Sequence, residues 1–351
     1  MRKVFLGFFL VLFSTCFAEM KEWGNDVQYN NIEKKQDGKY KIFSIDGGGI
    51  RGVFTLQLLV MLEKELHFIK NIDFFAGTST GSMIAFALAY GFTPDELLDL
   101  YVKYGHIIFS PYFSLPIDPL CLFPTYDNTK LKSFLQSIIK EDLTLADIPK
   151  KVLSVSFQLF NETTGTWTPC LLDNMDMDIA KNILVLDAIL RSEAAPTYFP
   201  SYQGCIDGGV IANNPSMAAL ARAIDRNGAN KKMENIRLFS IGTGMNANFI
   251  NKDVDWGATQ WMVFCPFANK NAPSHPLLEI LFDGTVAMPH YQCKQILGEN
   301  YFRLNASFSQ NVLLDDWKKI DYLIDEAKRF PESNPEKWNK LKDWIRTNFC
   351  D

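Results

Sequence analysis

The sequence predicts an α/β protein in which helices cover a mainly parallel central sheet. Short apolar runs, which are typical of buried strands, alternate along the chain with longer segments whose apolar residues recur at helical spacing. Such alternation is the pattern of a parallel sheet covered by helices. The composition supplies ample core-forming material, because 47% of the 351 residues are hydrophobic and 21% are charged.

Residues 1–18 predict a secretory signal peptide. Two basic residues precede an unbroken apolar run over 4–13, and small or weakly polar residues follow up to Ala18. The run is too short for a comfortable membrane span, and this order of regions is typical of an export signal. We therefore expect a secreted or extracytoplasmic protein, cleaved after Ala18; a lipoprotein site at Cys16 and a retained anchor are the alternatives. The polar residues 19–38 predict a mobile segment.

Two strand-to-helix units open the predicted domain, which spans 39–351. We expect strands at 39–46 and 72–77 and helices at 53–66 and 81–91. Each strand joins its helix through a short run of small residues, which suits a tight turn.

The remaining elements continue the alternation, and no repeat, low-complexity tract or linker interrupts it. They comprise predicted helices at 93–105, 130–140, 185–195 and 216–226, a strand pair at 151–160 and 166–172, a strand at 236–244, and a mostly helical C-terminal part, 245–351, with a short strand at 300–308. One domain is therefore the simplest division, with the motifs described below between 41 and 244.

Charge and cysteine usage argue against two classes of partner. The net charge is -5, the pI is about 5.5 and no block of like charges occurs, whereas nucleic-acid-binding proteins carry basic patches. Six cysteines remain after the signal peptide, and their irregular spacing is consistent with disulfides or with buried free thiols. No group of cysteines and histidines has metal-ligand spacing. We expect neither a nucleic acid partner nor a metal site.

A glycine-rich turn, SIDGGGIRGVF at 44–54, follows the first predicted strand. Gly47, Gly49 and Gly52 fit the G-x-G-x-x-G pattern that binds the pyrophosphate of a dinucleotide. Asp46, however, would place a carboxylate beside that pyrophosphate, and no acidic residue that could bind a ribose ends the second strand. These two features weaken the dinucleotide interpretation.

The same turn suits a transient negative charge. Consecutive glycines can present successive backbone N–H groups in one concave nest, and such donors stabilise the oxyanion of acyl transfer. We therefore expect Gly47, Gly48 and Gly49 to form part of an oxyanion hole. Arg51 is expected to support the loop through Asp46 or another carboxylate.

A second turn contains the candidate nucleophile. Gly77, Ser79 and Gly81 form G-x-S-x-G directly between a predicted strand and a predicted helix, which is the context of a nucleophile elbow. The small flanking residues allow a sharp turn that exposes the serine hydroxyl, and the amide of Thr80 would help to bind an oxyanion. The alternative is an ordinary tight turn in which Ser79 only caps the helix.

The base that would activate this serine has two kinds of candidate. Asp207 ends a short predicted strand, and Gly208 and Gly209 after it allow a sharp backbone turn. His275 and His290 follow in the chain order of an α/β-hydrolase triad, so a histidine base also fits. Taken singly, the Asp207 pattern is equally typical of an Asp-Gly turn.

Four motifs together resemble the patatin-like phospholipases, a family of lipid acyl hydrolases. They are DGGGIRG at 46–52, GTSTG at 77–81, SEAAPTYFP at 192–200 and DGGVIANNP at 207–215, in the family's order. The resemblance implies a three-layer α/β/α sandwich. It also implies a Ser-Asp dyad in place of a triad.

Carried onto this chain, the resemblance implies that Ser79 is the nucleophile and Asp207 activates it. It further implies that Gly47–Gly49 form the oxyanion loop and that Arg51 is the family's charged loop residue. The expected reaction is hydrolysis of fatty-acyl esters of glycerophospholipids, of the phospholipase A or lysophospholipase type, through an acyl-enzyme and without a cofactor.

A lipid substrate implies peripheral contact with a membrane or lipid aggregate. The apolar, proline-interrupted segment 106–124 is a candidate lid, or alternatively a packed core loop. A His-dependent carboxylesterase and a non-catalytic storage or binding protein of the same fold are the alternative functions.

Overall fold

The computed structural model describes residues 38–110, 123–250, 253, 255–262 and 275–350. The expected signal peptide, nearly all of the expected mobile segment and most of the candidate lid lie outside these ranges. The expectations for those segments therefore stay predictions.

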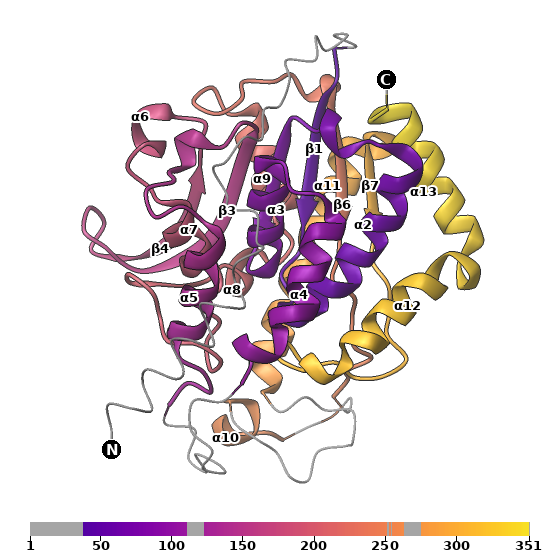
Figure 1. Ribbon diagram of the computed structural model, residues 1–351. Helices are drawn as coiled ribbons and strands as arrows, with labels where there is room; N and C mark the ends of the chain where they lie inside the picture. The colour runs from indigo at the N-terminus through magenta and orange to yellow at the C-terminus, as the bar shows by residue number, and fades with distance from the viewer. Residues whose placement is uncertain (1–37, 111–122, 251–252, 254, 263–274, 351) are drawn as a thin grey trace.

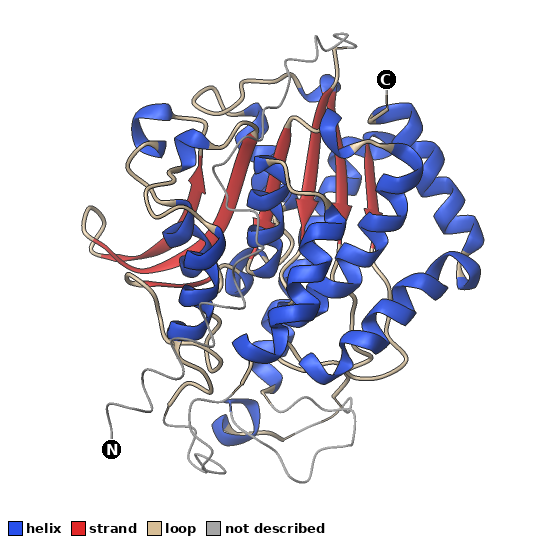
Figure 2. Cartoon of the chain, viewed as in Figure 1, coloured by secondary structure: helices blue, strands red, loops and turns tan. Residues whose placement is uncertain are grey.

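The described strands form one mixed sheet. They are β1 (Tyr40–Ile45), β2 (Phe74–Thr78), β3 (Lys151–Asn161), β4 (Thr166–Asp173), β5 (Cys205–Asp207), β6 (Ile236–Ile241) and β7 (Tyr301–Leu304). Their order is β4-β3-β2-β1-β6-β7, and β5 pairs with β3. Neighbouring strands from β3 to β7 are parallel, whereas β4 and β5 are antiparallel to β3. The predicted mainly parallel sheet is confirmed, and Figure 2 shows the parallel strands ending at one edge.

Helices cover both faces of this sheet (Figure 1). They are α2 (Gly52–Leu66), α3 (Thr80–Tyr90), α4 (Pro94–Ile108), α5 (Asn128–Ile138), α6 (Met177–Ala180), α7 (Val185–Ser192), α8 (Gly209–Ala212), α9 (Ser216–Ile224), α10 (Ala258–Met262), α11 (Pro276–Leu297), α12 (Ile320–Ser333) and α13 (Pro335–Asn348). No described helix has the length and apolar character that crossing a membrane requires.

The side chains of β1 explain the three layers. Phe43 packs in the larger apolar cluster, which includes residues of α2, α3, α4, α12 and α13, and its ring stacks on Phe239 at 5.1 Å between centroids. Ile42 points to the opposite face and packs with Leu220 of α9 and Leu297 of α11. Because successive side chains of a strand alternate between faces, an uninterrupted apolar strand is buried on both sides. The predicted α/β/α sandwich is therefore confirmed.

Several predicted boundaries differ from the structure by a few residues, and two of these differences bear on the site. The helix predicted at 93–105 continues to Ile108, so the first three residues of the candidate lid segment are helical. The helix predicted at 185–195 ends at Ser192. Pro196 accounts for this early end, because proline has no N–H for a helical hydrogen bond and disfavours helical conformation in the residue before it.

Candidate active site

Ser79 lies on the turn between β2 and α3, at the edge where the parallel strands end. Its backbone has φ 55° and ψ -130°, a conformation that a residue with a side chain seldom adopts. The neighbouring glycines make the turn possible, because a β-carbon on Gly77 would collide with the carbonyl of Gly81. This strained turn leaves Ser79 only partly buried. It has the geometry expected of a nucleophile elbow.

A second serine supports this turn. The Ser79 N–H donates to Ser192 Oγ at 2.8 Å, and the Ser192 hydroxyl donates to the carbonyl of Val155 at 2.6 Å. Ser192 thereby fastens the elbow to strand β3. Sequence reasoning did not assign it a role, although it is the first residue of the SEAAPTYFP motif.

Asp207 lies at the end of β5, and its carboxylate is near enough to the Ser79 hydroxyl for a hydrogen-bonding interaction between them to lower its pKa. Its Oδ1 also accepts the N–H of Gly209 at 2.7 Å, and the side chain is buried. Burial raises the pKa of Asp207 to about 6, while the hydrogen bonds from Ser79 and Gly209 oppose that rise. A β-carbon on Gly208 would collide with the carbonyl of Val155, so the glycine permits close packing against β3.

The two candidate histidines occupy other places. His290 Nδ1 lies 3.2 Å from the hydroxyl of Tyr301, a residue of the cluster under α9 and α11. His275 precedes the first turn of α11. Among the described residues, neither histidine lines the pocket that Ser79 faces, and the side chain bonded to Ser79 is Asp207. The geometry favours the carboxylate over a histidine as the partner of Ser79.

The glycine-rich loop after β1 lies directly beside Ser79. A β-carbon on Gly47 would be 3.2 Å from Ser79 Cβ. The Gly47 N–H donates to the carbonyl of Asn213 at 3.0 Å and so is already occupied. The amides of Gly48 and Gly49 have no acceptor within the described residues. These two are therefore the loop donors available to an oxyanion.

Thr80 contributes a further unoccupied amide, because it is the first residue of α3 and the first amides of a helix have no intrahelical acceptor. Its hydroxyl is hydrogen-bonded to Tyr101 of α4. That contact fixes the start of α3 against the neighbouring helix.

Asp46 is paired with an arginine that sequence reasoning missed. Arg303 of β7 donates to both carboxylate oxygens of Asp46, at 3.1 and 2.5 Å, and also to Ser240 Oγ at 2.6 Å. Arg51, the expected partner, instead donates from Nε to the carbonyl of Gly48 at 3.3 Å. The expectation that Arg51 supports the loop through a carboxylate is thus corrected: Arg303 holds the carboxylate, and Arg51 holds the backbone.

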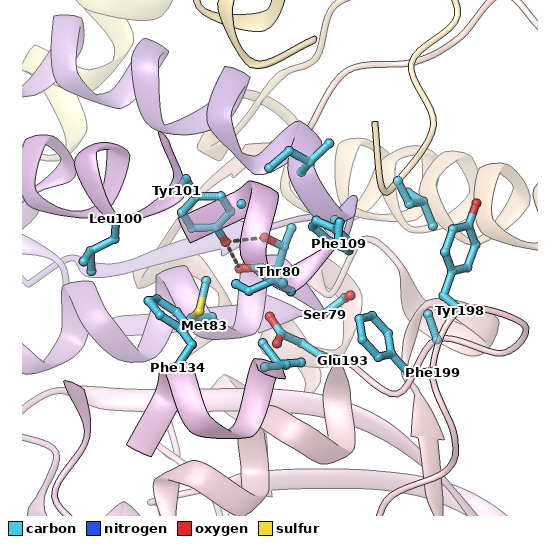
Figure 3. Close-up of a pocket in the computed structure, with 17 residues that line it drawn as sticks. Ser79, Thr80, Met83, Leu100, Tyr101, Phe109, Phe134, Glu193, Tyr198 and Phe199 are labelled. Atoms are coloured by element: carbon cyan, nitrogen blue, oxygen red, sulfur yellow. Dashed lines mark hydrogen bonds between the residues drawn. The ribbon is translucent and has the colours of Figure 1, made fainter. Parts of the chain in front are cut away.

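Ser79 opens onto an apolar pocket of about 650 Å³ (Figure 3). Helices α4 and α5, the start of α3 and the turn after α7 supply most of its walls. The lining residues are Gly49, Ile50, Ser79, Thr80, Met83, Leu100, Tyr101, Gly105, Ile108, Phe109, Leu131, Phe134, Glu193, Ala195, Tyr198, Phe199 and Leu314. The walls are mostly apolar and suit an alkyl chain.

Glu193 is an acidic residue among the mostly apolar residues that line this pocket. Burial, together with the nearby charge of Asp207, raises its pKa to about 8. The group is therefore mainly protonated at pH 7. The sequence offered no signal for this, because the placement of Glu193 depends on how the turn after α7 packs against α3.

The fold and site define an α/β sandwich with a serine and a carboxylate side by side at the opening of an apolar pocket. The family model described as patatin-like phospholipase matches residues 43–220, half of the chain. The sporulation protein CotR of Bacillus subtilis is 32% identical over 285 residues, which cover 76% of this chain and 87% of that protein. A cGAMP-activated phospholipase of Vibrio cholerae is 30% identical over 248 residues, covering 62% and 67% of the two chains.

Among solved structures, VipD from Legionella pneumophila is similar at a TM-score of 0.35 and 13% identity, covering 82% of this chain and 67% of that one. The sequence matches are the ones that establish the relationship. The chain belongs to the patatin-like phospholipase family.

Proposed function

We propose that this protein hydrolyses fatty-acyl esters of glycerophospholipids, as a phospholipase A or lysophospholipase, with Ser79 as nucleophile and Asp207 as its base. The observation that carries the proposal is the pairing of Ser79, on a strained turn, with the buried Asp207 at the mouth of an apolar pocket. Family membership supports the lipid substrate.

The reaction needs two acyl transfers. Asp207 accepts the Ser79 proton as the serine oxygen attacks the ester carbonyl, and the collapsing tetrahedral intermediate expels the lysolipid alkoxide. The alkoxide takes the proton from Asp207 and leaves as an alcohol. Water then attacks the acyl-Ser79 ester and gives a proton to Asp207; the serine takes that proton back as the fatty acid departs.

The amides of Gly48, Gly49 and Thr80 would bind the oxyanion of both intermediates. Fixed donors of this kind need no reorganisation during the reaction, and losing one costs about 10²–10³-fold in kcat in serine hydrolases. The Gly47 amide has a structural part, because its bond to Asn213 holds the loop beside Ser79.

The raised pKa of Asp207 matters for its proposed role. An ordinary aspartate has a pKa of about 3.9 and is a weak base at neutral pH. A pKa of about 6 makes Asp207 a stronger base that is still largely ionised at pH 7. Burial thus brings this carboxylate closer to the proton affinity that the reaction needs.

Hydrolysis of a phospholipid by purified protein tests the proposal. Mass spectrometry of the products should show free fatty acid and lysolipid with the wild type, and a loss of at least about 10³-fold with Ser79→Ala. Ser201→Ala is the matched control, since Ser201 is exposed, and it should retain full activity. Full activity in Ser79→Ala would contradict the proposal.

We also propose that one end of the molecule contacts the lipid surface. Exposed apolar side chains gather on α11 and α10, namely Leu277, Ile280, Leu281 and Met262. Helix α10 lies at the end of the molecule where the parallel strands terminate (Figure 1), which is also the end that contains Ser79. Apolar side chains there would enter the interface next to the substrate.

Charge substitution tests this surface. Ile280→Asp combined with Leu281→Asp should weaken binding to phosphatidylcholine vesicles about tenfold or more, because the transfer of two apolar side chains from water to the lipid surface would be lost. The control is Ile179→Asp on α6, because Ile179 is also an exposed apolar residue and α6 and α10 lie at opposite ends of the molecule in Figure 1. Equal vesicle binding by both variants would refute the proposed surface.

We further propose that the protein is exported. The order of basic, apolar and small residues within 1–18, which is typical of a signal peptide, supports this proposal. N-terminal sequencing of protein recovered outside the cytoplasm should begin at Glu19. Recovery of the full-length chain from the cytoplasm alone would contradict it.

A further inference from the structure

Glu193 is a buried carboxyl group that the proposed reaction does not use. Its side chain points into the pocket beside Ser79 (Figure 3), and the residue is 9% exposed. It lies close enough to Asp207 for the charge of Asp207 to raise its pKa, and close enough to Tyr101 for its own charge to raise the pKa of that phenol. Glu193 is therefore near the position that the carbonyl end of a bound acyl group would occupy.

The Glu193 carboxyl group makes no hydrogen bond to any residue within the described ranges. The pocket around it is mostly apolar, with Met83, Phe134 and Phe199 among the nearby walls (Figure 3). A protonated carboxyl has one donor and acceptor oxygens, and leaving such a group without a partner when a ligand excludes water from the pocket is costly. The side chain is thus positioned to hydrogen-bond to whatever fills the pocket.

An unsubstituted alkyl chain would not satisfy this group. When such a chain displaces water from the pocket, the carboxyl loses its solvent partners and gains none. A chain with a hydroxyl group near the ester carbonyl would supply both a donor and an acceptor at that point. Sites that hydrogen-bond a substrate hydroxyl discriminate strongly against the analogue without it.

We propose that Glu193 is a specificity-determining residue that selects acyl chains with a hydroxyl group at the second or third carbon, next to the ester carbonyl. This inference rests on the proposed function, because it places the acyl chain in the pocket that Ser79 faces. The preferred substrates are then esters of fatty acids that carry a hydroxyl group at the second or third carbon. The remainder of the acyl chain would lie against the apolar walls.

Competition between matched esters provides the kinetic test. The substrates are p-nitrophenyl dodecanoate and its 3-hydroxy and 12-hydroxy derivatives, with each rate divided by the rate of alkaline hydrolysis. The wild type should favour the 3-hydroxy ester over dodecanoate by about tenfold to a hundredfold in kcat/KM, and the 12-hydroxy ester should gain nothing. Glu193→Met should lose the preference, and Glu193→Gln, which keeps a donor and an acceptor, should retain most of it.

Direct binding separates this inference from the proposed function. Calorimetry with Ser79→Ala protein and the corresponding methyl esters should show the same order of affinity without any turnover. If neither ester is hydrolysed but the binding preference holds, the proposed reaction fails and the inference stands. Equal binding of methyl dodecanoate and methyl 3-hydroxydodecanoate overturns the inference, whether or not the esters are hydrolysed.

Two controls keep the result specific to the pocket. Glu141→Met makes the same chemical change at an exposed position and should leave the preference as in the wild type. The near and far hydroxyl groups are compared within the wild-type protein, so the test does not depend on the folding of the Glu193 variants. Equal preference for the 3-hydroxy and 12-hydroxy esters also overturns the inference.

Discussion

The turns at Asp46 and Asp207 both begin with Ile-Asp-Gly-Gly but have different surroundings. Each aspartate lies at or directly after the end of a strand, precedes consecutive glycines and is buried. Asp46 is paired through both oxygens with Arg303, whereas Asp207 has the hydroxyl of Ser79 and the amide of Gly209 as partners. The neighbour therefore distinguishes the two aspartates: a cation pairs with Asp46, whereas among the described residues no cation pairs with Asp207, which suits the base that we propose.

Removing the charge of Asp207 is the substitution with the largest expected effect. Asp207→Asn keeps the acceptor for the Gly209 amide but cannot take the Ser79 proton, so kcat should fall by up to about 10⁴-fold. Hydrolysis of p-nitrophenyl dodecanoate measures the loss, with Asp142→Asn at an exposed site as the control. If Asp207→Asn retained a tenth of the wild-type rate, Asp207 would not be the base.

Removing the cation beside Asp46 should instead affect stability. Arg303→Met leaves the buried Asp46 carboxylate unpaired, which should lower the free energy of unfolding by about 3–5 kcal/mol. Urea denaturation followed by circular dichroism measures the change. The double variant Asp46→Asn, Arg303→Met should recover part of the loss, since it also removes the unpaired charge; an unchanged stability in Arg303→Met would show that the pair is not an anchor.

Ionisation of the buried Asp207 should lower the stability of the folded protein. Its folded-state pKa of about 6 exceeds the ordinary aspartate value of 3.8, so the folded state holds the proton more tightly. The contribution of this group to stability is therefore fully present below the ordinary pKa of 3.8 and is lost as the pH rises through the folded-state pKa of about 6. The loss reaches at most about 3 kcal/mol at pH 7.

Asp207→Asn carries no such ionisation and should be more stable than the wild type at pH 7. The advantage should shrink as the pH is lowered through 6 and should vanish at about pH 3, below the ordinary value of 3.8, where the wild-type carboxyl is mostly protonated in both states. Thermal unfolding of the two proteins across this range measures the difference. A wild type that is the more stable at pH 7 would mean that Asp207 has a stabilising partner like that of Asp46.

The smallest predicted effect is on the pH dependence of activity. Asp207 must be ionised to accept a proton, so kcat/KM should rise with pH and level off above about 6, the raised pKa of this group. Below that value the rate should fall about tenfold per pH unit, which corresponds to about 1.4 kcal/mol. A profile that is flat between pH 4 and 7 would indicate a base with an unperturbed carboxyl pKa.

The sequence predicted those features that depend on neighbouring residues. The β1 and β2 strands, the helices after them and the turns with Asp46 and Ser79 are all specified within about a dozen residues, because apolar periodicity and glycine act locally. The chain order also placed Asp207 after a strand. These predictions of structure agree with the observed elements.

The features that were missed depend on contacts between distant segments. Arg303 reaches Asp46 from 257 residues along the chain, and Ser192 reaches Ser79 from 113. Neither contact leaves a periodic or compositional signal, because each depends on which distant elements pack together in the fold. The position of Glu193 in the pocket has the same origin.

Covalent labelling tests directly whether Ser79 is a nucleophile that Asp207 activates. A fluorophosphonate reacts with an activated serine, and intact-protein mass spectrometry followed by peptide mapping locates the adduct. We predict one adduct per chain, on Ser79, and none on Ser79→Ala. Labelling of Asp207→Asn should be slower by at least about tenfold, because the serine proton has no acceptor. An adduct on another residue, or labelling of Ser79→Ala at the wild-type rate, would show that Ser79 is not the activated nucleophile.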